Sequence, residues 1–136
     1  MKKFLCFFSL IFTISFSQKI KLEENNGILL NKDDKKPFTG VLKDGRDRQY
    51  FYKGKANGKW LSFYSNGKLK TIENWKDGKL DGKYIVYTED GKKYMEVFYE
   101  EGIEDGYYKL FNLDGSPRIV GRFKDGKATG KWKRYN

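Results

Sequence analysis

Acidic residues recur in pairs beside glycines, and their spacing is the nearest approach to catalytic chemistry in this sequence. Asp77 with Asp81, and Glu101 with Asp105, occupy equivalent places along the chain. Two carboxyl groups hydrolyse glycosides when one of them keeps a raised pKa in a partly apolar cleft. Acidic residues beside glycines in lysine-rich segments are more typical of turns and of solubilising charge. We therefore expect these pairs to shape turns.

Other catalytic arrangements lack the residues that they need. The sequence has no histidine and one cysteine, Cys6. Ser-His pairs, Cys-His pairs and ordinary zinc sites are therefore not expected. The glycines flank strand-like runs with no helix after them, which argues against a phosphate-binding loop. The sequence predicts a protein that is not an enzyme, with no catalytic residue, no metal and no cofactor.

Lysine is the more informative charged residue, and the formal net charge is +10 at pH 7. Lysines follow the repeated glycines, so stacked repeats would align them into stripes. Such a stripe attracts anionic lipid, lipopolysaccharide or an acidic protein. Alternatively, it keeps sheet edges solvated and unpaired. The candidate binding stripe consists of Lys55, Lys59, Lys79, Lys83, Lys127 and Lys131.

A repeat of 24 residues, written three times between Gly54 and Asp125, must position these side chains. A period of about 20 to 50 residues indicates a repeat architecture, in which each unit buries its apolar face against its neighbours. The register is marked by one row of glycines at Gly54, Gly78, Gly102 and Gly126, and by a second at Gly58, Gly82, Gly106 and Gly130.

Aromatic residues keep the same register and are expected to form a structural column along the repeats. Corresponding rings would meet in offset or edge-to-face contacts. In the second strand of each repeat, alternation places the aromatic on one face with Thr71, Met95 or Ile119, and we expect that face to be the core. The predicted aromatic column consists of Trp60, Tyr84, Tyr108, Trp132, Trp75, Tyr99 and Phe123.

Each repeat reads as one β-hairpin. Asn66-Gly67, Asp90-Gly91 and Asp114-Gly115 separate pairs of apolar and aromatic runs. Asn-Gly and Asp-Gly supply the two positive φ angles of a type I′ turn, so we expect that turn here. The fold class predicted is all-β, a meandering antiparallel sheet of stacked β-hairpins. The expected strands are 59–65 and 68–76, 83–89 and 92–100, and 107–113 and 116–124.

The N-terminus has the pattern of a secretory signal peptide over residues 1–17. Two lysines precede an apolar run that ends at Phe16, with small residues near the end. This pattern predicts cleavage before Gln18 and a secreted or periplasmic protein. A buried strand or a membrane anchor is the alternative, but the apolar run is shorter than the roughly 20 residues that span a bilayer. Removal of the signal would also remove Cys6.

The rest of the chain divides into two parts. Residues 18–27 are a polar N-terminal segment, and residues 28–136 form the repeat domain. Its first repeat is shortened, as expected for the cap of a repeat array. The expected repeats are 28–53, 54–77, 78–101 and 102–125, followed by a half-repeat at 126–136.

Several short motifs resemble the MORN-repeat variant of exported bacterial proteins. They lie at Trp75 to Tyr84, Phe123 to Trp132, Tyr64 to Lys68 and Pro37 to Gly40. The resemblance covers residues 28–136 and implies a meandering sheet of stacked hairpins. Some bacterial relatives are described as YwqK-type antitoxins, whereas other MORN arrays are scaffolds for protein contacts or binders of acidic phospholipids.

The sequence thus favours a non-enzymatic, exported repeat protein that acts as a protein-binding scaffold in the cell envelope or outside the cell. The alternatives are peripheral binding of anionic membrane lipid or lipopolysaccharide through the lysines, and an antitoxin-like role as partner of a toxin protein. Another protein is the expected partner, and an anionic membrane surface is the alternative. Nucleic acid and small-molecule cofactors are not expected, since lysine serves bidentate phosphate or base recognition poorly.

Overall fold

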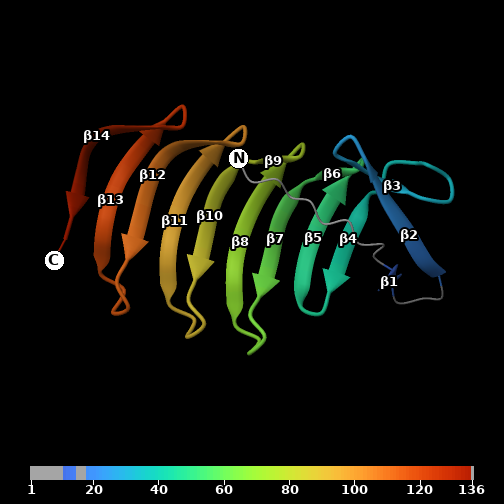
Figure 1. The fold of residues 1–136 in the computed structure, drawn as a ribbon, viewed down its shortest axis with the longest axis horizontal. Coiled ribbons are helices and arrows are strands. Elements are labelled where there is room, and N and C mark those ends of the chain that lie inside the picture. The colour runs from blue at the N-terminus through green and yellow to red at the C-terminus, as the bar shows by residue number, and fades with distance from the viewer. Residues whose placement is uncertain (1–10, 15–17, 136) are drawn as a thin grey trace.

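A computed structural model describes residues 11–14 and 18–135, and these residues contain strands and turns but no helix. The strands form one sheet of 11 strands and a second sheet of 3 strands (Figure 1). All strand pairs are antiparallel, and neighbours in the large sheet follow one another along the chain, except that two short strands of two residues each lie beside this order. The predicted all-β sheet of consecutive hairpins is confirmed.

The three regular repeats supply the middle of the large sheet. In each repeat a first strand is followed by a return strand, with a two-residue strand before the first strand of the first two repeats. The first strands are β7 (Gly58–Phe63), β10 (Gly82–Tyr87) and β12 (Ile103–Phe111). The return strands are β8 (Leu69–Lys76), β11 (Lys93–Glu100) and β13 (Pro117–Lys124). The short strands are β6 (Lys55–Ala56) and β9 (Lys79–Leu80), and β14 (Lys127–Arg134) forms one edge.

The N-terminal part is less regular. β4 (Gly40–Asp44) and β5 (Asp47–Tyr52) join the large sheet. The small sheet contains β1 (Ile11–Ile14), β2 (Gln18–Asn25) and β3 (Ile28–Asn31). Segment 28–53, expected as one short repeat, is therefore shared between the two sheets, and segment 18–27 contains a strand that its polar composition did not reveal. The predicted signal peptide, 1–17, lies outside the described residues except for β1.

The turns correct one prediction. The positive φ angles of a type I′ turn occur between hairpins, where Asp77 and Gly78 have φ of 49° and 83°. At Asn66-Gly67 only the glycine has a positive φ, 85°. The N–H of Gly67 donates to the carbonyl of Tyr64, and Asn66 Oδ1 accepts from the N–H of Lys68 at 2.9 Å. The expected type I′ turn at Asn66-Gly67 was wrong, because the asparagine side chain closes a longer turn there. It was also wrong at Asp90-Gly91 and Asp114-Gly115, where only the glycines have a positive φ.

A register shift next to this turn recurs in every repeat. It lies between Ser62 and Phe63 in the first repeat, and the equivalent shifts lie at Val86/Tyr87 and Leu110/Phe111. An extra residue in one strand of a hairpin bends that strand and increases its twist. The repeated shift therefore gives each hairpin the same local geometry, and the hairpins follow one another as a twisted ribbon of strands (Figure 1).

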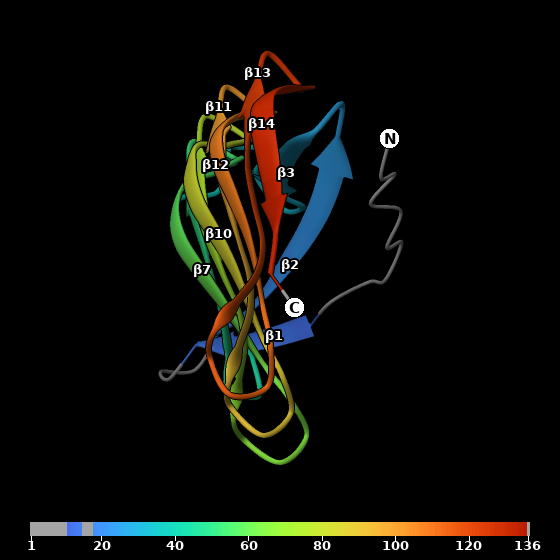
Figure 2. The same cartoon turned by 90° about the vertical axis from the view of Figure 1, so that its left-hand side faces the viewer.

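Burial is concentrated on one side of the sheet. The buried apolar side chains are Phe38, Leu42, Val97 and Leu110, and no side chain among the described residues is less than 2% exposed. Seen along the sheet in Figure 2, the large sheet is a single layer, with the hairpin of β2 and β3 to one side. Its stability must come from contacts between neighbouring strands, as in other repeat proteins.

The N-terminal strands are joined to the array at Gly54. The N–H of Leu29 donates to the Gly54 carbonyl at 2.8 Å, and the N–H of Gly54 donates to the Phe38 carbonyl at 2.6 Å. A Cβ on Gly54 would lie 2.7 Å from the carbonyl oxygen of Leu29. With a φ of 76°, Gly54 therefore needs both the left-handed conformation and the absence of a side chain.

Candidate functional site

The strand register divides the side chains of the large sheet between two faces. Trp60 pairs with Glu73, Tyr84 with Val97, and Val97 with Tyr108. Paired residues share a face, as do residues two apart in a strand. We call one side the aromatic face, defined by Phe51, Trp60, Trp75, Tyr84, Tyr99, Tyr108, Phe123 and Trp132. This face includes all seven residues of the predicted column.

The rings of the aromatic face meet mainly within hairpins. Ring centroids are 5.0 Å apart for Trp60 and Trp75, and 6.1 Å apart for Tyr84 and Tyr99. Contacts between successive hairpins occur at the two ends, where Phe51 lies 5.1 Å from Trp60, and Phe123 lies 5.2 Å from Trp132. The predicted contact between corresponding rings occurs for Tyr108 and Trp132, 5.4 Å apart. In the other regular repeats the rings instead meet between the two strands of one hairpin, because the turn places those strands side by side.

Polar groups on the aromatic face are satisfied by one another. The Trp75 indole N–H donates to Glu73 Oε2 at 2.9 Å, and the hydroxyls of Ser62 and Thr71 are 2.6 Å apart. Burial, and then the Glu73 carboxylate, raise the pKa of Tyr84. Burial, and then the Glu104 carboxylate, raise the pKa of Tyr99 to about 12. The face is therefore aromatic with few charges, and Glu73 and Glu104 each lie close to an indole or a hydroxyl.

The opposite side is the lysine face. A cross-strand row runs along it through Lys43, Arg48, Leu61, Ile72, Ile85, Glu96, Lys109, Val120 and Lys133. A parallel row includes Lys59 with Asn74, Lys83 with Phe98, and Tyr107 with Arg122. The middle of the face is apolar, and cations surround it. These two rows contain a single carboxylate, Glu96.

All six residues of the predicted stripe lie on the lysine face. Lys59 and Lys83 belong to the second row, and Lys131 lies two residues before Lys133. The other three follow the inter-hairpin turns, in the pairs Tyr52 with Lys55, Lys76 with Lys79, and Lys124 with Lys127. Within residues 20–135, only Lys79 of the six makes an ion pair, with Glu101 at 3.3 Å. Five of these ammonium groups thus have no carboxylate partner in the described part of the chain.

Glu96 has a separate, structural role on the lysine face. Its carboxylate lies 2.7 Å from Lys93 Nζ, and the Tyr107 phenol is its other polar neighbour. Burial alone raises the pKa of Glu96, but Lys93 and Tyr107 outweigh that effect, so the pKa lies below its usual value. Burial and the Glu96 carboxylate raise the pKa of Tyr107 to about 12. Sequence reasoning missed this cluster, whose signal was an acidic residue in the middle of an apolar strand.

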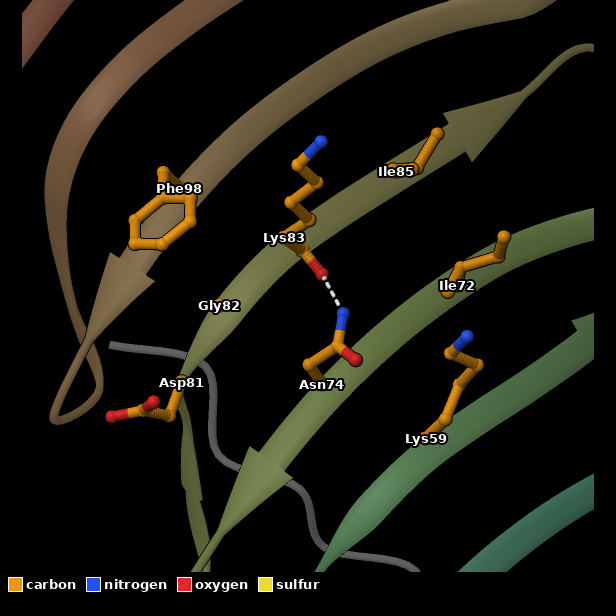
Figure 3. A pocket seen from close by; sticks show the side chains of 8 residues that line it. All are labelled: Lys59, Ile72, Asn74, Asp81, Gly82, Lys83, Ile85 and Phe98. Atoms are coloured by element: carbon orange, nitrogen blue, oxygen red, sulfur yellow. Dashed lines mark hydrogen bonds between the residues drawn. The ribbon is translucent and has the colours of Figure 1, made fainter.

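A shallow groove of about 420 Å³ crosses the middle of the lysine face. Ile72, Ile85 and Phe98 form apolar parts of its lining, and the side chains of Lys59 and Lys83 stand on the same side of the sheet (Figure 3). Asn74, Asp81 and Gly82 also line the groove. The Asn74 amide donates to the Lys83 carbonyl at 2.6 Å, which fixes the two strands beneath it. The groove combines aliphatic contact with two cations, a combination that suits an anionic amphiphile.

The paired carboxylates close turns. Asp81 Oδ2 accepts from the N–H of Glu101 at 3.3 Å, and Asp105 Oδ2 accepts from the N–H of Asp125 at 3.2 Å. A hydrogen bond from Lys124 and that backbone bond lower the pKa of Asp105. A general acid needs the opposite shift. No cluster of three or more metal-ligating side chains occurs among the described residues.

No helix in the described part of the chain is long and apolar enough to cross a membrane. In comparisons with known proteins, no family model matches this chain, and no curated protein matches it.

Proposed function

We propose that this protein is a non-enzymatic, exported scaffold that binds another protein through the aromatic face. The observation that supports the proposal is the separation of the two faces. Aromatic side chains and few charges lie on one face of a single-layered sheet, and over β7 to β14 no second layer of described strands lies on it. The centres of protein interfaces are rich in Tyr, Trp and Phe and poor in charge. A sheet with an apolar face is stabilised by burying that face.

Footprinting of the unchanged protein tests this proposal. A partner retained from a cell-envelope extract is purified, and side-chain oxidation is compared with and without it. We expect protection of Tyr84, Met95 and Tyr108 on the aromatic face. Phe98, which lines the groove on the lysine face, should not be protected. Protection confined to the lysine face contradicts the proposal. Met95→Glu should weaken the partner's affinity about tenfold or more, and Lys83→Glu, its matched control, should not.

A second candidate is peripheral binding to anionic lipid or lipopolysaccharide through the lysine face. Its specific support is the set of lysines without carboxylate partners around the groove. Association through exposed cations weakens as salt is added. Vesicles containing anionic lipid should bind at low salt and release the protein at high salt, and the double variant Lys59→Glu, Lys83→Glu should not bind. Absence of binding to anionic vesicles at low salt rejects this candidate.

The resemblance to the bacterial MORN-repeat variant supports the scaffold proposal, and it is also the basis for an antitoxin-like role. For that role the retained partner would have to be a toxin protein that meets this chain outside the cytoplasm. Export itself is tested by the N-terminal residue of the mature protein, which we expect to be Gln18. A chain that keeps residues 1–17 and stays in the cytoplasm contradicts export.

A further inference from the structure

β14 is an edge strand with one neighbour among the described strands. It pairs with β13 and forms the end of the large sheet (Figure 1). All eight of its residues are exposed. An edge strand presents N–H and C=O groups that an added strand can pair with. β14 therefore has the backbone requirement for binding an extended segment.

The regular repeats show what normally lies beside a strand of this type. In each repeat, the second-row glycine of the first strand pairs with an aromatic residue of the return strand. That aromatic contacts the ring two residues after the glycine, with centroid distances of 5.0, 6.1 and 6.0 Å. The glycine pairs are Gly58 with Trp75, Gly82 with Tyr99, and Gly106 with Phe123.

In β14 the equivalent residues are Gly130 and Trp132. Trp132 packs inward, 5.2 Å from Phe123 and 5.4 Å from Tyr108, and it is 37% exposed. Trp60, in the equivalent position, contacts Trp75 of its return strand. Trp132 has no such contact, because no described strand follows β14. An added strand with an aromatic opposite Gly130 would complete it.

The charge of β14 determines which strand fits. The strand carries Lys127, Lys131, Lys133 and Arg134 and no acidic residue. None of these four has an ion-pair partner within residues 20–135. Like charges on facing strands destabilise a sheet, so pairing of two β14 strands from two copies is disfavoured. An acidic segment is favoured for the same reason.

We propose that β14 binds an extended, acidic segment of a partner protein as an additional antiparallel strand, with an aromatic residue of that segment opposite Gly130. Backbone hydrogen bonds would supply affinity, and the aromatic side chain would set the register. The proposal rests on the proposed scaffold function and names the chemistry of the partner's segment. The binding site differs from that of the scaffold proposal, because the segment binds at the edge of the sheet and the scaffold's partner binds on the aromatic face.

Peptides copied from the return strands of this chain are suitable probes. Residues 93–101, KYMEVFYEE, contain Tyr99 and three glutamates against one lysine. Residues 117–124, PRIVGRFK, also contain a return-strand aromatic, Phe123, but carry three cations and no acid. Binding to the whole protein is measured by titration calorimetry, and the site by amide chemical shifts. We expect the acidic peptide to shift the amide signals of β14. The basic peptide should bind at least about tenfold more weakly.

Two variants test the register and the charge. Lys133→Glu on the protein and Tyr99→Ser in the peptide should each weaken binding about tenfold. Lys43→Glu, on the same face in the opposite edge strand β4, should leave the affinity unchanged. Added salt should weaken binding of the acidic peptide. Equal affinity for both peptides, shifts outside β14, or dimerisation through β14 overturns the proposal.

The outcomes also separate this proposal from the scaffold function. Suppose that the protein partner binds the Lys133→Glu variant and the unchanged protein with equal affinity, and that the acidic peptide binds to neither of them. The edge proposal is then overturned, and the scaffold function stands. If the peptide binds at β14 but the partner leaves the aromatic face unprotected, the scaffold assignment to that face is overturned instead.

Discussion

The two faces of the large sheet share one backbone, and they differ in how their side chains are stabilised. On the aromatic face, Leu42, Val97 and Leu110 are buried among rings. On the lysine face, the buried residue is the ionised side chain of Glu96. The free energy of folding therefore depends on apolar contact on one face and on one charged cluster on the other. The difference indicates that substitutions can separate stability from binding.

The largest expected effect compares apolar truncations on the two faces. Leu110→Ala should lower the free energy of unfolding by about 3 kcal/mol, because it leaves a cavity under the rings. Ile85→Ala, at a half-buried position on the lysine face, should lower it by about 1 kcal/mol, because part of that side chain already contacts water. Urea unfolding measures both. Equal losses would show that the two faces share the core.

The next effect concerns the charged cluster on the lysine face. Glu96→Gln should lower the free energy of unfolding by about 1 kcal/mol at neutral pH, since it removes the ion pair with Lys93. The folded pKa of Glu96 is lowered, so its contribution is present above the unfolded pKa and is lost as pH falls through the folded value. Unfolding measured from neutral pH to acid should therefore show a flatter pH dependence in the variant. If the variant and the unchanged protein lose stability equally as pH falls, Glu96 does not have this role.

Tyrosine ionisation gives a finer comparison of the faces. Tyr99 on the aromatic face and Tyr107 on the lysine face both have a pKa of about 12. Because these pKa values are raised, the stability that the neutral phenols contribute is present below about pH 10 and is lost as pH rises through 12. Glu96→Gln should lower the pKa of Tyr107 and leave Tyr99 unchanged. Phenolate absorbance, with Tyr99→Phe and Tyr107→Phe to assign the two transitions, measures this.

The smallest effect on stability should come from the exposed lysines. Lys59→Glu and Lys83→Glu should each change the free energy of unfolding by no more than about 0.5 kcal/mol, because exposed charges without partners contribute little. The same changes should reduce any affinity for anionic vesicles. A large loss of stability would show that these lysines belong to the folded framework and would weaken their assignment to binding.

The turns show where sequence reasoning reached its limit. Repeated glycines located the turns of the regular repeats, but the choice of turn type was wrong at Asn66-Gly67, Asp90-Gly91 and Asp114-Gly115. The Asn-Gly pair was expected to take two positive φ angles, and instead the Asn66 side chain accepts a hydrogen bond from the backbone. The two positive φ angles appear at Asp77-Gly78, between hairpins. Local sequence allows both arrangements, and the spacing of the adjoining strands decides between them.

The sequence by itself determined the period, the hairpins and the all-β class, because glycines and aromatics recur at fixed spacing and alternation sorts the side chains of a strand. It did not determine that Lys55, Lys79 and Lys127 share a face with Lys59, Lys83 and Lys131, which depends on the strand register. It also did not reveal the buried Glu96, the groove beside Asn74 or the division of segment 28–53 between two sheets. Each of these depends on which strands become neighbours, and only the tertiary structure fixes contacts between residues far apart in the chain.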